Sequence, residues 1–132
     1  IAAIHAGWRG AYKGIIQKVI KFMFDKGCKK KDMVVAIGPN ISMKNYEVGK
    51  KFKDKFVKKD NKNIKFFENK KNKIYFDLFN YVKKQVKLNQ IKNIDQLNID
   101  TFDEKNNFFS ARRSLKLNHN DYGRNISIIV IN

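Results

Sequence analysis

Three segments carry apolar residues at helical spacing, which predicts helices over residues 15–23, 46–56 and 78–86. Gly27 follows the first of these segments and is suited to end its helix. Asp77 stands directly before the third segment, where an aspartate side chain caps the first turn of a helix. The pattern therefore predicts three amphipathic helices separated by non-helical segments.

Short apolar runs between and around these helices predict strands. They lie at residues 1–4 (the end of a strand), 33–37, 94–99 and 126–131. The runs 64–67 and 74–76 flank a polar, turn-like segment and predict a β-hairpin. A polar loop is expected over 114–122. Because the hairpin interrupts the alternation of strands and helices, a mixed α/β sandwich is favoured over a regular doubly wound parallel sheet.

Length and composition agree with one folded domain. The chain has 132 residues, 42% of them hydrophobic, with eleven Phe and five Tyr, so it has enough apolar side chains for a core. No apolar run reaches the roughly 18 to 20 residues of a membrane span, and no signal-peptide pattern is present, so we expect a cytoplasmic protein. Because the first residue is Ile1 within a strand-like run, we expect the chain to be an N-terminally truncated portion of a longer protein.

The net charge of +17 raises the question of nucleic-acid binding, since lysine and arginine contacts to phosphate dominate such affinities. Of the 29 cationic residues, 25 are lysines spread along the chain, which is typical of a solvated surface. No zinc-finger spacing, basic zipper helix or aromatic RNA-binding signature accompanies the charge. A specific nucleic-acid partner is therefore not favoured.

The four arginines are more informative than the lysines. They are Arg9, Arg112, Arg113 and Arg124. A planar guanidinium grips a carboxylate or phosphate with two parallel hydrogen bonds, which a lysine does not do. Arg112 and Arg113 precede the polar loop and Arg124 follows it, so these residues either converge on an anion or close the loop through structural ion pairs.

One segment combines several features of a binding site. His5 stands where a strand is expected to end, and Gly7, Arg9 and Gly10 follow it before the first helix. The glycines permit close approach of the backbone to a ligand, and Arg9 adds a bidentate grip on an anion. A lone histidine is more often structural than metal-binding, and three or four zinc ligands are not found together here. His119 is expected to be exposed, and Cys28 is most simply a helix-end thiol.

Several motifs together resemble one protein family in order and spacing. They are His5-Ala6-Gly7-Trp8-Arg9-Gly10, Ile37-Gly38-Pro39-Asn40-Ile41, Tyr46-Glu47-Val48-Gly49, Phe76-Asp77-Leu78, Phe108-Phe109-Ser110-Ala111-Arg112-Arg113 and Gly123-Arg124. The family has been called polyphenol oxidase (laccase-like), peptidoglycan editing factor and purine nucleoside phosphorylase. The chain resembles its C-terminal half over essentially all 132 residues, so we expect residues 1–132 to be the C-terminal part of a single family domain.

The resemblance implies a four-layer α/β/β/α sandwich with mixed sheets and a zinc site made of two His and one Cys. It assigns His5 as one zinc ligand and places the other two in the N-terminal half of the family. Cys28 does not match the family's cysteine. Asn40 and Asp100 stand where many members have Cys, and Ala111 replaces a frequent aromatic residue.

The resemblance also implies an activity. It suggests a zinc-dependent purine nucleoside phosphorylase that acts on adenosine, inosine and S-methyl-5'-thioadenosine, with adenosine deaminase activity. The partners would be a purine nucleoside and phosphate. Phosphorolysis needs an anchored phosphate and charge stabilisation of the leaving purine, for which Arg9, Arg113 and Arg124 are the candidate catalytic residues. The isolated segment is expected to be inactive.

Two other classes of function remain open. One is a peptidoglycan-precursor editing hydrolase or a laccase-like oxidoreductase on the same fold. Copper oxidation is the weaker of these, since multicopper chemistry needs many His ligands and the sequence has two His. The other is a basic nucleic-acid-binding protein without catalysis. The sequence does not indicate the oligomeric state.

Overall fold

The computed structural model describes residues 1–130, and an aromatic cluster forms the centre of its core. Phe56 and Phe76 are completely buried, with 0% of their surface exposed. The ring of Phe56 has other aromatic rings around it at centroid distances from 4.8 to 6.5 Å, namely those of Trp8, Tyr12, Phe52, Phe67, Phe76 and Tyr81. Such edge-on, tilted and stacked pairs add to the free energy gained by burying the rings.

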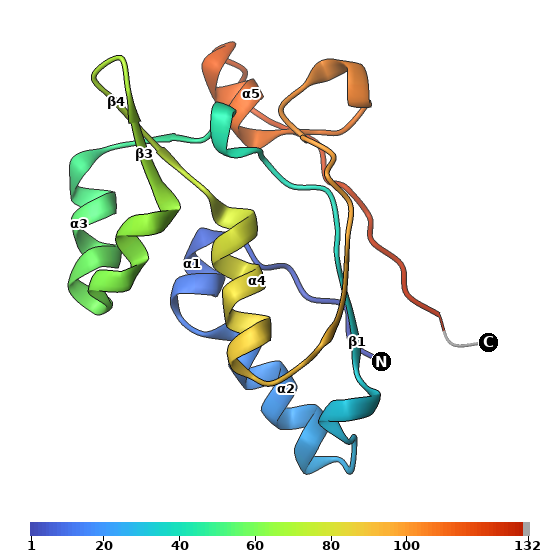
Figure 1. The fold of residues 1–132 in the computed structure, drawn as a ribbon. Helices are drawn as coiled ribbons and strands as arrows, with labels where there is room; N and C mark the ends of the chain where they lie inside the picture. Colours follow the sequence, from blue (N-terminus) through green and yellow to red (C-terminus); the bar gives the residue numbers. More distant parts are fainter. Residues whose placement is uncertain (131–132) are drawn as a thin grey trace.

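Residues 1–130 contain five α-helices (Figure 1). They are α1 (Trp8–Tyr12), α2 (Ile15–Asp25), α3 (Lys50–Lys59), α4 (Leu78–Leu88) and α5 (Ala111–Lys116). Gly14, which caps the start of α2, has a φ of 80°, a left-handed conformation that glycine adopts without strain, and it separates α1 from α2. The carboxylate of Asp77 accepts a hydrogen bond from the Asn80 N–H and caps α4, as predicted.

Two small sheets accompany the helices. The parallel sheet pairs β1 (Val34–Ile37) with β5 (Asn93–Gln96), and an isolated parallel bridge between Asn40 and Asp100 follows farther along. The antiparallel sheet has the order β2-β4-β3. Its strands are β2 (Glu47–Val48), β3 (Phe67–Lys70) and β4 (Lys73–Phe76). Single-turn or short 3-10 segments connect these elements: η1 (Lys30–Asp32), η2 (Met43–Asn45), η3 (Asn61–Phe66) and η4 (Glu104–Asn106).

The mixed α/β class predicted from the sequence is confirmed, and so are the first and third predicted helices and the strands that became β1 and β5. The predicted β-hairpin is present, but the bounds of its first strand were wrong, because Asn61–Phe66 forms the 3-10 segment η3 and β3 runs over Phe67–Lys70. The prediction of a helix from residue 46 was wrong in its start, because α3 begins at Lys50. Glu47 and Val48 pair with β4 instead. Over so few residues, the apolar and aromatic positions fit the spacing of a helix and that of a strand equally well. The backbone pairing with β4 makes this stretch a strand.

Two predicted strands and part of a predicted loop also differ. Residues 1–4 and 126–130 are not strands, and Ile131 lies outside the described residues. A strand needs a partner that exchanges backbone hydrogen bonds with it, and within residues 1–130 no ladder includes either segment. The first residues of the predicted polar loop, from Ser114 to Lys116, belong to α5, whose start is capped by the Ser110 hydroxyl.

The helices are short. Across residues 1–130, none combines the length and the apolar character needed to cross a membrane.

Candidate functional site

His5 lies close to the two glycines that follow it, Gly7 and Gly10. Gly7 is the N-cap of α1, with extended φ and ψ of −61° and 166°. A β-carbon added at Gly7 would lie 3.0 Å from Nε2 of His5, and one added at Gly10 would lie 3.6 Å from the His5 carbonyl oxygen. The exposed imidazole of His5 therefore lies over the α-carbon of Gly7, and a larger residue there would push it away.

Arg9 lies on the solvent side of α1. Its side chain is exposed, and the guanidinium carbon is 5.2 Å from the centroid of the Trp8 ring, a cation-π distance. The ion pairs found within residues 1–130 do not include Arg9. The Arg9 guanidinium thus rests on the indole ring, and no carboxylate within residues 1–130 forms an ion pair with it.

A second polar region joins the loops that follow the two parallel strands. The Asp100 carboxylate accepts hydrogen bonds from the Ser42 N–H at 3.1 Å, the Ser42 hydroxyl at 2.5 Å, Asn45 Nδ2 at 2.7 Å and the Phe102 N–H at 2.9 Å. Partial burial alone would raise the pKa of this carboxyl. The hydrogen bonds from Ser42, Phe102 and Asn45 outweigh that effect and lower the pKa below its ordinary value.

The role of Asp100 in this network was not predicted from the sequence, in which Asp100 stands out only as an aspartate where many family members have Cys. The available signal was its position directly after a predicted strand, because loops at the carboxyl ends of neighbouring parallel strands meet at one edge of a sheet. The bridge between Asn40 and Asp100 confirms that these two loops are adjacent.

Arg112 and Arg113 point to different parts of the molecule. Arg112 donates to the Glu47 carbonyl at 2.8 Å, and its guanidinium carbon is 5.0 Å from the Tyr46 ring centroid. Arg113 donates to backbone carbonyls of one loop at 3.2, 3.0 and 2.7 Å, those of Thr101, Phe102 and Phe108. Arg113 therefore fastens the loop that leads from β5 to α5.

Among residues 1–130, Arg124 contacts only its neighbours in sequence. Its guanidinium donates to the Tyr122 and Gly123 carbonyls, and its central carbon is 4.3 Å from the Tyr122 ring centroid. Arg112, Arg113 and Arg124 bond to different acceptors within residues 1–130, and their convergence on an anion stays a prediction. The predicted alternative of ion pairs closing the loop is not observed within residues 1–130, because the acceptors are carbonyl groups.

The described residues do not fit a zinc site by themselves. Among residues 1–130 no three His, Cys, Asp or Glu side chains are grouped closely enough to hold a metal ion. His5 is exposed, with an imidazole free to reach outward. Cys28 is an exposed free thiol, and His119 is exposed as predicted. Any metal at His5 would need ligands beyond the described residues.

Comparison with known proteins gives a consistent result along the whole chain. The family described as multi-copper polyphenol oxidoreductase laccase matches residues 1–132. A purine nucleoside phosphorylase of Rickettsia prowazekii is 34% identical over 99% of this chain and 55% of its own length. That of Haemophilus influenzae is 33% identical over 98% of this chain and 51% of its length. The purine nucleoside phosphorylase YfiH of Escherichia coli is 26% identical over 86% of this chain and 45% of its length. The chain thus spans about half the length of the curated relatives it matches.

Proposed function

The chain belongs to the multi-copper polyphenol oxidoreductase laccase family, and from that premise we propose that it is the C-terminal half of a cytoplasmic purine nucleoside phosphorylase domain. The proposed reaction is phosphorolysis of a purine nucleoside by inorganic phosphate. The proposed substrates are adenosine, inosine and S-methyl-5'-thioadenosine, with deamination of adenosine as a second activity. The main support is the similarity over 99% of the chain to a relative that bears the phosphorylase name.

Arg9 is the residue best suited to hold the phosphate. Phosphorolysis requires the phosphate to approach the ribose C1 carbon in a fixed orientation, which a guanidinium fork supplies better than a flexible ammonium group. Arg9 is exposed and oriented by Trp8, and among the residues described it has no carboxylate to pair with. This geometry supports Arg9 as the phosphate anchor.

Arg113 and Arg124 are proposed to support the reaction together with Arg9, each in a different way. The contacts of Arg113 with three carbonyls support a role in shaping the 101–108 loop. Arg124 is exposed, and it follows the polar segment that comes after α5. Both of its hydrogen bonds within residues 1–130 are donated by Nη1, so its other N–H groups are accessible to a charged substrate. A second guanidinium such as that of Arg124 would stabilise the negative charge that develops on the leaving purine.

His5 is proposed as one ligand of a zinc ion. The imidazole is exposed and lies against Gly7, so its nitrogen atoms are accessible. Zinc in such a site would supply Lewis-acid chemistry. Because the described residues offer a single candidate ligand, we assign no reaction step to the metal.

The test is an assay of the full-length protein with adenosine and inorganic phosphate. Release of adenine together with ribose 1-phosphate is expected, and formation of inosine without phosphate would report the deaminase activity. Arg9→Lys should raise the KM for phosphate, whereas Arg112→Lys, which removes a guanidinium bonded to the Glu47 carbonyl, should leave it unchanged. Absence of both products in a folded, zinc-supplemented protein would refute the proposal.

A further inference from the structure

The outer surface of α1 forms a depression whose lining is entirely aromatic or cationic. The lining residues are Trp8, Arg9, Tyr12, Lys13 and Lys55, and we call this surface the basic depression. Its volume is about 260 Å³. None of the 12 Asp and Glu residues, all within the described part of the chain, lines it.

The aromatic rings at the base of the depression are anchored in the core. The Trp8 ring packs edge-on against Phe52 at a centroid distance of 5.0 Å, and Tyr12 packs edge-on against Phe56 at 5.0 Å. Phe56 is completely buried. The two rings of α1 are therefore positioned by core packing, and they offer the cations beside them a fixed surface to rest on.

Three cations rest on these two rings. The Lys55 ammonium lies 5.5 Å from the Trp8 centroid and 4.8 Å from the Tyr12 centroid, so it is placed between the rings. The Lys59 ammonium lies 4.4 Å from the Tyr12 centroid and donates to the Tyr12 carbonyl. Arg9 lies over Trp8 on the other side. Restriction of these side chains before binding lowers the entropy that a ligand must overcome to order them.

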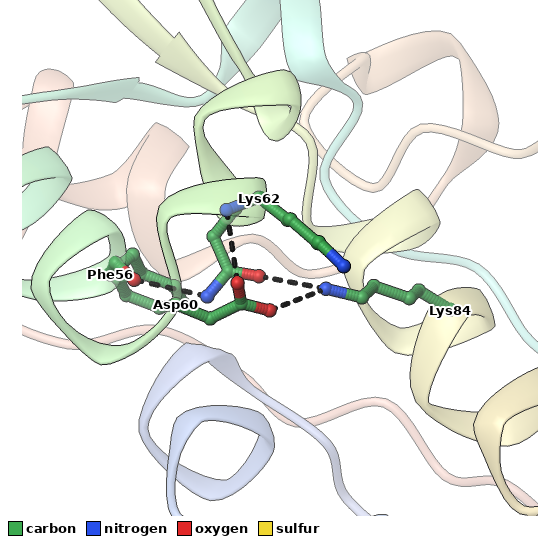
Figure 2. A network of polar contacts seen from close by, with 5 residues as sticks. Phe56, Asp60, Lys62 and Lys84 are labelled. Carbon is green, nitrogen blue, oxygen red and sulfur yellow. Dashed lines mark hydrogen bonds and ion pairs between the residues drawn. The ribbon is translucent and has the colours of Figure 1, made fainter.

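The positive charge of this surface is not neutralised by neighbouring acids. Asp54, next to Lys55, is paired with Lys50 at 2.9 Å. Asp60, next to Lys59, accepts from Lys84 at 3.0 Å and from the Lys62 N–H (Figure 2). Throughout residues 1–130, no ion pair includes Arg9, Lys13, Lys55 or Lys59.

We propose that the basic depression binds a small molecule bearing two or more linked phosphate groups. Three cations line the depression, namely Arg9, Lys13 and Lys55, and a fourth, Lys59, rests on the Tyr12 ring beside it. They exceed what a single phosphate contacts, whereas a diphosphate carries enough charge and length to reach several of them. The guanidinium supplies a bidentate contact and the ammonium groups supply point charges. The site rests on the proposed function only through Arg9, since the proposed phosphorolysis assigns no role to Lys13, Lys55 or Lys59.

The experiment measures binding of inorganic pyrophosphate and of orthophosphate to the full-length protein by calorimetry at constant ionic strength. Pyrophosphate should bind at least about tenfold more tightly than orthophosphate, because more charge-assisted contacts form. Lys55→Gln should weaken pyrophosphate binding by about threefold to tenfold, and Lys13→Gln should act in the same direction. Both residues are exposed, so folding should be preserved, as circular dichroism would confirm.

The matched control is Lys26→Gln. Lys26 is also exposed and also rests on one ring, with its ammonium 5.7 Å from the Phe22 centroid, but it lies at the end of α2. Its loss removes the same charge and should leave the pyrophosphate affinity unchanged. Equal weakening by Lys26→Gln and Lys55→Gln would mean that only the net charge matters, and the proposal would be wrong.

The remaining outcomes separate this site from the proposed function. Pyrophosphate binding that depends on Lys55 in a protein without phosphorolysis would uphold the site and remove the proposed function. Phosphorolysis in a protein whose pyrophosphate affinity does not change on Lys55→Gln would support the proposed function and overturn the proposed diphosphate site. Binding of double-stranded DNA, but not of pyrophosphate, with the same dependence on Lys55 would identify a nucleic-acid contact and overturn the proposal.

Discussion

The carboxylate of Asp100 accepts hydrogen bonds from both the backbone N–H and the hydroxyl of Ser42, a residue 58 positions earlier in the chain. These bonds connect the loop after β1 to the loop after β5. Asn45 Nδ2 contributes a further bond to the same carboxylate. An acceptor-only group surrounded by donors is suited to its ionised form, which explains its lowered pKa.

Acid should therefore weaken the fold through Asp100. Because its pKa is lowered in the folded protein, its contribution to stability is complete above the unfolded value of about 3.9 and is lost as the pH falls through the lower folded value. Asp100→Asn should reduce the free energy of unfolding at pH 7 by about 1–3 kcal/mol and flatten the acid dependence below about pH 4. Denaturant titrations at several pH values measure both effects.

Asp95→Asn is the control for this prediction. Asp95 is exposed and accepts one hydrogen bond, from the Gln96 N–H. Its substitution should change the free energy of unfolding by less than about 0.5 kcal/mol. An Asp100→Asn protein with wild-type stability and wild-type acid dependence would show that the Ser42 and Asn45 contacts do not stabilise these loops.

Phe56→Ala should be the most damaging single truncation in the core. Phe56 is fully buried and its ring contacts those of Trp8, Tyr12 and Phe76 among others. Loss of its ring should cost about 3–5 kcal/mol of unfolding free energy. Phe22→Ala, at a position that is 61% exposed in α2, should cost less than about 0.5 kcal/mol. Similar denaturation midpoints for the two variants would contradict the central place of Phe56 in the core.

Most helices and paired strands were predictable from the sequence because their apolar spacing agrees with their burial. The residues of α4 that face the core, such as Tyr81 and Val86, lie at the predicted spacing. Residues 126–130 show why the rest was not predictable. Ile126 and Ile128 fit a strand by composition, yet they are 86% and 83% exposed, since a strand is defined by its partner as much as by its own residues.

The candidate site was predictable only in part. The segment from His5 to Gly10 was identified because its glycine, histidine and arginine residues indicate a binding site by their type alone, although Trp8–Gly10 belong to α1 and not to the expected loop. The partners of Arg113 were not, because all of them are backbone carbonyls, which every residue possesses. Likewise, the cations over Trp8 and Tyr12 include Lys55 from a helix more than 40 residues later, a proximity that only the packing of α1 against α3 creates.

Arg113→Lys should loosen the loop between β5 and α5. An ammonium group has neither the reach nor the fork that lets Arg113 contact three carbonyls at once. The variant should lose about 1–3 kcal/mol of stability, with faster amide exchange over residues 101–108. Arg112→Lys, at an exposed position, is the control and should leave exchange in that loop unchanged. Unchanged exchange in Arg113→Lys, together with a lower kcat in the full-length protein, would instead assign Arg113 to substrate contact.

The position of the His5 imidazole should depend on Gly7 having no side chain. A β-carbon at this position would lie 3.0 Å from His5 Nε2, closer than an ordinary contact, so Gly7→Ala should displace the imidazole. Gly49→Ala is a matched control, because Gly49 is also an extended helix N-cap and an added β-carbon meets nothing within 4 Å. Both variants should lose the same few tenths of a kcal/mol at the cap. Only Gly7→Ala should shift the His5 ring resonances in a histidine NMR spectrum and lower the zinc content of the full-length protein. Equal spectra and equal zinc content for the two variants would show that Gly7 does not set the position of His5.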